Sequence, residues 1–159
     1  LGPDMSQARM ARLAQKFAAW RVPRDVQAGA KAAIARDRAE GYRLVIATAA
    51  PEFYAGAIGE ALQFEDVIAS RHMRSDAGDW LPQIDGDNCY GAEKGRRAKA
   101  WLADNGVTGG AHIRAYSDHP SDASLFELAD ESVLVGSGDK LAALAQQHGW
   151  LLQDFRKAS

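Results

Sequence analysis

The run LVIATAAP at residues 44–51 decides the fold class. Its first four residues are continuously apolar, which is typical of a parallel strand that helices cover on both faces. Pro51 suits the first position of a helix, so we expect a sharp turn over residues 48–51 and a helix that continues through Leu62. A strand followed at once by a helix is the repeating unit of a parallel α/β sheet.

The same alternation continues on both sides of this run. Upstream, we expect a helix that starts after Ser6 and that Pro23 ends or separates from a second helix, over about residues 24–40, which Gly41 ends. Downstream, we expect strands at 67–69, 112–116, 132–135 and 150–152, a loop or hairpin at 71–88, and helices at 93–104, from the turn at 117–121 to about 128, and around 141–149. The pattern predicts a three-layer, Rossmann-like parallel sheet.

Composition excludes several classes of function. The 159 residues include 19 basic and 21 acidic side chains, so no global positive field exists to hold nucleic acid. Cys89 is the single cysteine, which excludes an internal disulfide and a multi-cysteine zinc site and favours a reducing, cytoplasmic location. No apolar run approaches the roughly 20 residues of a membrane span, and no secretory signal is recognisable. The first residues, 1–4, do not resemble a natural start, so we expect a cut N-terminus.

Thr48 is the first candidate for a binding site. Ligands of open α/β sheets bind beyond the carboxyl ends of the strands, and Thr48 lies at such an end. Its hydroxyl, with the backbone N–H groups of Ala49 and Ala50 at the start of a helix, suits an anion such as phosphate. The ordinary role of a threonine in this position, to cap the helix, is the alternative.

Lys94 and two aspartates are the other candidates. Lys94 lies in the first turn of an expected helix, where the helix dipole disfavours a cation unless an anion compensates. A solvated lysine paired with Glu93 is the alternative. Asp118 and Asp122 are four residues apart across a turn that contains Pro120, so they can converge on one hard cation such as Mg²⁺. Alternatively, Asp122 caps a helix and Asp118 forms an Asx-turn.

Three short motifs occur in a fixed order: IAT at 46–48, GAEK at 91–94 and YSDHPSD at 116–122. They resemble motifs two, three and four of the haloacid dehalogenase (HAD) superfamily, in its phosphoserine-phosphatase-like branch. The resemblance runs from about residue 24 to the end. It implies that residues 24–159 form a HAD-like core domain and that residues 1–23 are the end of a helical cap.

The resemblance implies a Mg²⁺-dependent phosphomonoester hydrolase that acts on a small phosphorylated molecule. Thr48 and Lys94 would be catalytic and would bind the phosphoryl group, with Ala49 and His119 also contacting substrate. Asp118 would ligate Mg²⁺. Asp122 would assist as a second ligand or through hydrogen bonds that support the loop.

One departure from the family is large. Its first motif, Asp-x-Asp after an apolar strand, supplies the nucleophile and the central strand, and this sequence has no such motif. Its single Asp-x-Asp, Asp85-Gly86-Asp87, follows no apolar strand and is expected to be a solvated turn. We therefore expect the slot in the sheet to be filled by an upstream segment or by a strand exchanged from another copy. We also expect the 159-residue chain alone to be inactive.

Other readings remain open. Without a nucleophile, a HAD-like domain could serve as a non-catalytic binding or regulatory module, with the apolar residues Met10, Leu13, Phe17 and Trp20 docking a partner helix, although such a stripe is usually core. A dinucleotide site is a weaker alternative, because Leu141 stands where the Gly-x-Gly-x-x-Gly loop at 136–141 needs its third glycine. The four histidines show no zinc-ligand spacing.

Overall fold

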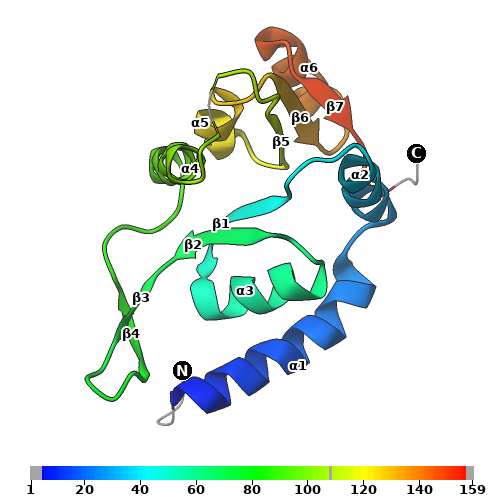
Figure 1. The fold of residues 1–159 in the computed structure, drawn as a ribbon. Coiled ribbons are helices and arrows are strands. Elements are labelled where there is room, and N and C mark those ends of the chain that lie inside the picture. The colour runs from blue at the N-terminus through cyan, green and yellow to red at the C-terminus, as the bar shows by residue number, and fades with distance from the viewer. Residues whose placement is uncertain (1–4, 108, 157–159) are drawn as a thin grey trace. The chain divides into compact units, whose positions relative to one another are not determined.

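The computed structural model describes residues 5–107 and 109–156. These residues form two compact units, which are described separately (Figure 1). The first unit holds residues 5–26 and 34–89, and the second holds residues 27–33 together with the described residues from 90 onward. Within the described chain, no helix combines the length and the apolar character that crossing a bilayer requires.

The first unit is a small α/β layer. Its elements are α1 (Gln7–Asp25), the end of α2 (Ala28–Ala39), β1 (Val45–Pro51), α3 (Glu52–Ala61), β2 (Asp66–Ser70), β3 (His72–Arg74) and β4 (Trp80–Ile84). β1 and β2 pair in parallel, with Ile46 opposite Val67. α3 contacts both strands and α1, and it lies between the two-stranded sheet and α1 in Figure 1.

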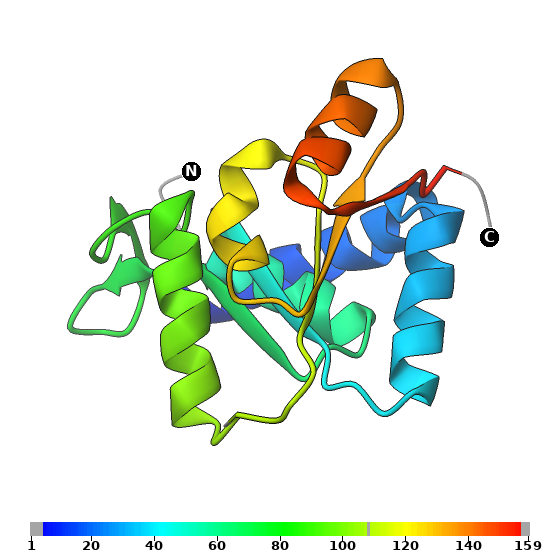
Figure 2. The same ribbon diagram turned by 90° about the horizontal axis from the view of Figure 1, so that it is seen from above.

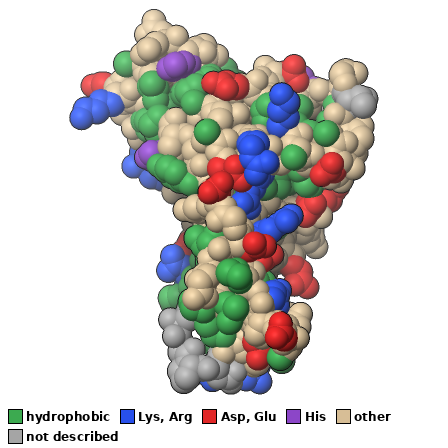
Figure 3. Space-filling view, turned by 90° about the vertical axis from the view of Figure 1, so that its left-hand side faces the viewer, with side chains coloured by type: hydrophobic (Ala, Val, Ile, Leu, Met, Phe, Trp, Pro, Cys, Tyr) green, Lys and Arg blue, Asp and Glu red, His purple; other side chains and the backbone are tan. Residues whose placement is uncertain are grey.

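The expected hairpin over residues 71–88 is confirmed. β3 and β4 pair antiparallel, and Trp80 at the start of β4 is 7% exposed. Its ring lies 5.0 Å from the ring of Phe53 in α3, and the Phe53 ring lies 5.6 Å from that of His72. Figure 3 views the protein from the side of this hairpin and shows hydrophobic side chains among charged ones there, where Met73 and Ile84 are exposed.

The second unit is a three-stranded parallel sheet with helices. Its elements are α4 (Ala92–Asp104), β5 (Arg114–Ser117), the 3₁₀ turn η1 (Pro120–Asp122), α5 (Ala123–Phe126), β6 (Glu131–Val135), α6 (Asp139–His148) and β7 (Leu151–Gln153). β6 pairs in parallel with β5 and with β7 (Figure 2). Its core is built from Phe126, Leu134 and Ala145, with Trp150 against the Phe126 ring at 4.5 Å.

The break between the first two helices lies two residues later than expected, because α1 includes Pro23 and ends at Asp25. Proline has no N–H to donate to the carbonyl four residues earlier, so one helical hydrogen bond is missing at Pro23, and the helix ends two residues later. The Arg24 guanidinium also donates to the Trp20 carbonyl oxygen at 2.7 Å, which satisfies a carbonyl near this end. As a result, α2 begins at Ala28 rather than at residue 24.

The sharp turn expected over residues 48–51 is also wrong. β1 continues to Pro51, whose pairing with Ser70 resumes after an irregularity that follows Ala47. The strand absorbs the change of direction as a local bulge. Smaller shifts affect the strand ends, since β5 starts at Arg114 and β7 starts at Leu151.

The apolar stripe expected on the first helix does not form one buried face. α1 buries Met10, Ala14 and Ala18, whereas Leu13 is 48% exposed and Trp20 is 52% exposed. Met10, Ala14 and Ala18 recur at spacings of four residues and so share one side of α1, whereas Leu13 and Trp20 lie outside this buried row. Of the four residues in the stripe, Met10 alone is buried, and Phe17 is half-buried against the Tyr54 ring at 4.6 Å.

Gly59 in α3 provides a test of the helix-on-sheet packing. A Cβ at Gly59 would lie 2.5 Å from Val67 Cγ2 in β2, whereas a Cβ at Gly56 would meet nothing within 4 Å. We expect Gly59→Ala to lower the free energy of unfolding by about 1–3 kcal/mol through overpacking. The matched variant Gly56→Ala should raise it by about 0.5–1 kcal/mol, because alanine favours the helix. Urea unfolding midpoints measure both, and equal effects at the two positions would contradict the close approach.

Candidate functional site

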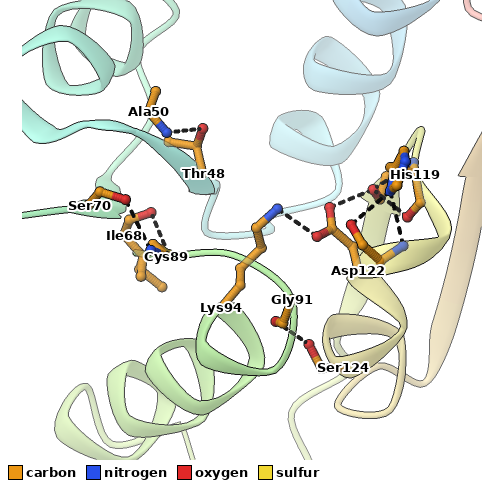
Figure 4. Close-up of polar contacts among 12 residues, drawn as sticks. Thr48, Ala50, Ile68, Ser70, Cys89, Gly91, Lys94, His119, Asp122 and Ser124 are labelled. Carbon is orange, nitrogen blue, oxygen red and sulfur yellow. Dashed lines mark hydrogen bonds and ion pairs between the residues drawn. The ribbon is translucent and has the colours of Figure 1, made fainter. Parts of the chain in front are cut away.

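Thr48 lies near the carboxyl end of β1, in the first unit. Its Oγ1 accepts a hydrogen bond from the Ala50 N–H at 3.1 Å (Figure 4). The hydroxyl hydrogen of Thr48 therefore stays available to a ligand, while the Ala50 N–H is already engaged. The side chain is half-buried, as a residue at the mouth of a site would be.

Ser70 braces the same end of the strands, and sequence analysis missed it. It is 2% exposed, and its Oγ lies 2.9 Å from the Ala49 carbonyl oxygen and 2.6 Å from Asn88 Oδ1. The same Oγ accepts a hydrogen bond from the Cys89 N–H at 3.0 Å. One hydroxyl thus joins the Thr48 segment to the chain that leads into α4. A small polar residue at the end of a strand is the only local signal of this role.

Lys94 is buried in the second unit and is paired with Asp122. It is 7% exposed, and its Nζ lies 2.6 Å from Asp122 Oδ1 (Figure 4). The second carboxylate oxygen of Asp122 accepts a hydrogen bond from Ser117 Oγ at 2.7 Å. A cation in the first turn of a helix requires an anion nearby, and here Asp122 is that anion.

Glu93 is engaged with two arginines. Its carboxylate accepts hydrogen bonds from Arg96 and Arg97 at 2.6 Å. The hydrogen bond from Arg96 is the largest effect, and with that from Arg97 it lowers the pKa of Glu93 to about 2. The alternative of a solvated Lys94 paired with Glu93 is therefore wrong, because Lys94 is buried against Asp122 and Glu93 binds the two arginines.

Gly95 allows the ion pair to form. A Cβ at Gly95 would lie 2.6 Å from Ser124 Cβ and 2.8 Å from the Ser124 carbonyl oxygen, so α4 touches the start of α5 through its glycine. Ser124 Oγ donates a hydrogen bond to the Gly91 carbonyl oxygen at 2.8 Å. These contacts hold the first turn of α4 against the segment that carries Asp122.

Asp118 and His119 lie in the loop between β5 and η1. Asp118 is exposed. The His119 N–H donates to Ser117 Oγ, and His119 Nδ1 accepts the Ser121 N–H, both at 3.1 Å. Nδ1 also lies 2.7 Å from Ser121 Oγ. The loop is therefore ordered by its own side chains, and the Asp118 carboxylate is left facing solvent.

The described residues contain no group of three or more His, Cys, Asp or Glu side chains arranged around a metal position. Asp118 supplies an exposed carboxylate, whereas both oxygens of Asp122 already accept hydrogen bonds. Asp85 and Asp87 are exposed beyond the end of β4. Thr48 and Ala49 belong to the first unit, and Lys94, Asp118, His119 and Asp122 belong to the second. That Thr48 and Asp118 face one crevice stays a prediction.

Comparison with known proteins identifies the family. The model of the haloacid dehalogenase-like hydrolases matches residues 3–127, which is most of the chain. The chain belongs to this family. The HAD-like α/β fold expected from the sequence is thereby confirmed.

Individual proteins are also similar to this chain. Protein CicA of Caulobacter vibrioides is 32% identical over 97 residues, a match that covers 59% of this chain and 40% of CicA. This chain therefore spans less than half the length of that relative. A protein of unknown function from Bordetella pertussis Tohama I has a similar fold, with a TM-score of 0.83, 24% identity, and coverage of 94% of this chain and 68% of its own. A phosphoserine phosphatase, solved as a phospho-aspartyl intermediate analogue, has a TM-score of 0.59 at 18% identity, over 82% of this chain and 59% of its own.

The buried ion pair makes a sharp prediction for stability. Asp122→Asn would leave the Lys94 ammonium buried without a counter-charge, so we expect the free energy of unfolding to fall by about 3–5 kcal/mol. Asp118→Asn, four residues away on an exposed side chain, should change it by less than about 0.5 kcal/mol. Urea unfolding of the two variants and the unchanged chain measures the difference. Similar stability of the two variants would show that Lys94 does not depend on Asp122.

Proposed function

We propose that the complete protein is a Mg²⁺-dependent phosphomonoester hydrolase of the HAD type. The observation that carries this proposal is the buried contact of Lys94 Nζ with Asp122 Oδ1 at 2.6 Å, beside a loop that presents the exposed Asp118. A fixed cation and a free carboxylate on neighbouring segments suit the binding of a phosphoryl group and of a hard divalent cation.

Lys94 would hold the phosphoryl group by charge and by hydrogen bonds. An ammonium has three N–H donors, and Asp122 uses one of them. The others would donate to phosphoryl oxygens and to the carboxylate nucleophile. Because Asp122 and Ser117 fix the lysine in advance, little reorganisation would be needed when substrate binds.

Thr48 and its neighbours would complete the contacts to substrate. Thr48 Oγ1 accepts from Ala50, which leaves its hydrogen to donate to a phosphoryl oxygen. The Ala49 N–H would donate to another. Ser70, which contacts the Ala49 carbonyl oxygen, would hold this segment in place. His119 would contact the rest of the substrate, a small phosphorylated molecule.

Mg²⁺, which HAD phosphatases generally use, would neutralise charge on the transferring phosphoryl group. Asp118 fits as its ligand, because its carboxylate is exposed and oxygen ligands are those that Mg²⁺ prefers. For Asp122, the two hydrogen bonds to Lys94 and Ser117 favour support of the loop over direct ligation. The sequence reading allowed both roles, and Asp122 as a metal ligand stays the alternative.

The nucleophile would come from outside the 159 residues. Thr48, Lys94 and Asp118 can bind and orient a phosphoryl group, but none is a credible nucleophile for it in this chemistry. The phosphoserine phosphatase of similar fold was solved as a phospho-aspartyl analogue, which supports an aspartate in this role. A non-catalytic HAD-like module is the second candidate, favoured by the lack of an Asp-x-Asp motif after an apolar strand in these residues.

The first prediction from this proposal concerns the chain by itself. We expect the 159-residue chain to show no Mg²⁺-dependent turnover of p-nitrophenyl phosphate, because it lacks the nucleophile. The same assay on a longer protein that carries an upstream Asp-x-Asp segment should show turnover. Intact mass confirms which protein is in each assay. Turnover by a preparation of 17.1 kDa would contradict the proposal that the nucleophile comes from outside these residues. Asp85 would then be the first candidate nucleophile to test.

The second prediction from this proposal concerns Asp118 in the complete protein. Asp118→Asn should lower kcat/KM for a phosphate monoester by about 100-fold or more, since loss of a metal ligand removes several kcal/mol of charge stabilisation. Asp104→Asn, a matched change on an exposed carboxylate at the end of α4, should leave kcat/KM unchanged. Circular dichroism verifies that both variants are folded. Full activity of the Asp118 variant would rule out its role as a metal ligand.

A further inference from the structure

The outward side of α1 combines cations with large apolar side chains. Residues separated by three or four positions along this helix are all exposed, and we call them the outer face: Arg9, Arg12, Leu13, Lys16, Trp20 and Arg24. Four of the six are cations and none is a carboxylate. The single acidic residue of α1, Asp25, forms an ion pair with Arg21.

The charge of α1 differs from that of the whole chain. The helix carries five cations and one carboxylate, which gives a net charge of +4, whereas the chain as a whole carries −2. The cations of the outer face therefore do not reflect a generally basic protein. A local basic face on an acidic protein indicates an anionic partner for that face.

Two large apolar side chains lie within this basic face. Leu13 is 48% exposed and Trp20 is 52% exposed, while the opposite side of α1 buries Met10, Ala14 and Ala18. The guanidinium groups of Arg21 and Arg24 lie 5.4 Å and 5.8 Å from the centre of the Trp20 ring. An indole beside cations, with a leucine two turns away on the same face, has the composition of a helix that lies in a membrane interface.

We propose that the outer face of α1 docks on an anionic lipid bilayer, with the helix axis parallel to the membrane plane. Each cation near an anionic surface contributes about 1 kcal/mol, and Leu13 and Trp20 would enter the headgroup region. A nucleic acid would use the cations but leave Leu13 without a role. A stable protein interface has an apolar core with few charged residues, whereas four of the six residues of the outer face are cations. The proposal stands independently of the phosphatase chemistry.

Vesicle sedimentation tests the proposal on the complete protein. We expect it to sediment with vesicles of equal parts phosphatidylcholine and phosphatidylglycerol, and not with vesicles of phosphatidylcholine alone or without vesicles. Binding should weaken when the salt is raised from about 0.1 M to 1 M, because the Debye length falls from about 10 Å to about 3 Å. Failure to bind the acidic vesicles, or equal binding to both kinds, would overturn the proposal.

Matched variants locate the contact. Arg12→Gln with Lys16→Gln should lower the partition coefficient about 30-fold, because two cations are lost from the outer face. The control Lys99→Gln with Lys140→Gln makes the same change of net charge on exposed residues of α4 and α6. It should lower the partition coefficient less than about 3-fold. Leu13→Ala with Trp20→Ala should weaken binding without a change of charge. Equal losses in the two charge variants would show that the outer face is not the contact with the vesicle. A dimer that dissociates in the Leu13/Trp20 variant, without vesicle binding, would show that the outer face binds a second copy of the chain.

Discussion

The buried pair of Lys94 and Asp122 is the interaction on which the site of the second unit depends. Two charges removed from water are stabilised only when they contact each other and when their remaining atoms find partners. Asp122 meets this condition through Ser117, and Lys94 through its 2.6 Å contact with Asp122. The pair in turn requires α4 to touch the start of α5, which Gly95 permits and Ser124 reinforces. The loop that presents Asp118 is therefore fixed by a polar network around a single glycine contact.

Much of the fold could be predicted from local signals. The apolar run at 44–47 gave β1, and the glycines at 41 and 149 mark positive φ angles just after α2 and α6. Two boundaries differ from the local rule. α1 continues for two residues past Pro23, although proline removes one helical hydrogen bond, and β1 continues to Pro51, where pairing with β2 resumes after an irregularity. At residues 48–51 the local rule identified a distortion of the chain, which the strand accommodates as a bulge.

The site was only partly predictable from sequence. Lys94 could be singled out because a cation in the first turn of a helix opposes the helix dipole, and its burial beside Asp122 explains the anomaly. The roles of Ser70 and Ser117 could not be foreseen, because their partners are set by contacts between segments and not by the strand ends in which they lie. Ser70 acts on Cys89, which is 19 residues away in the chain. Such roles exist only once distant segments have come together.

The burial of β1 gives a physical reason to look for another strand. All seven of its residues are half-buried, whereas β6, which has a strand on each side, contains the fully buried Val133 and Leu134. Within the described residues β1 has one neighbour, β2, although its continuously apolar start is typical of a strand inside a parallel sheet. Two paired strands alone are marginally stable in water. A further parallel strand on the free edge of β1 would satisfy its N–H and C=O groups and cover its side chains. In the proposed phosphatase, the segment that brings the nucleophile would be this strand, so the same addition would complete both the sheet and the chemistry.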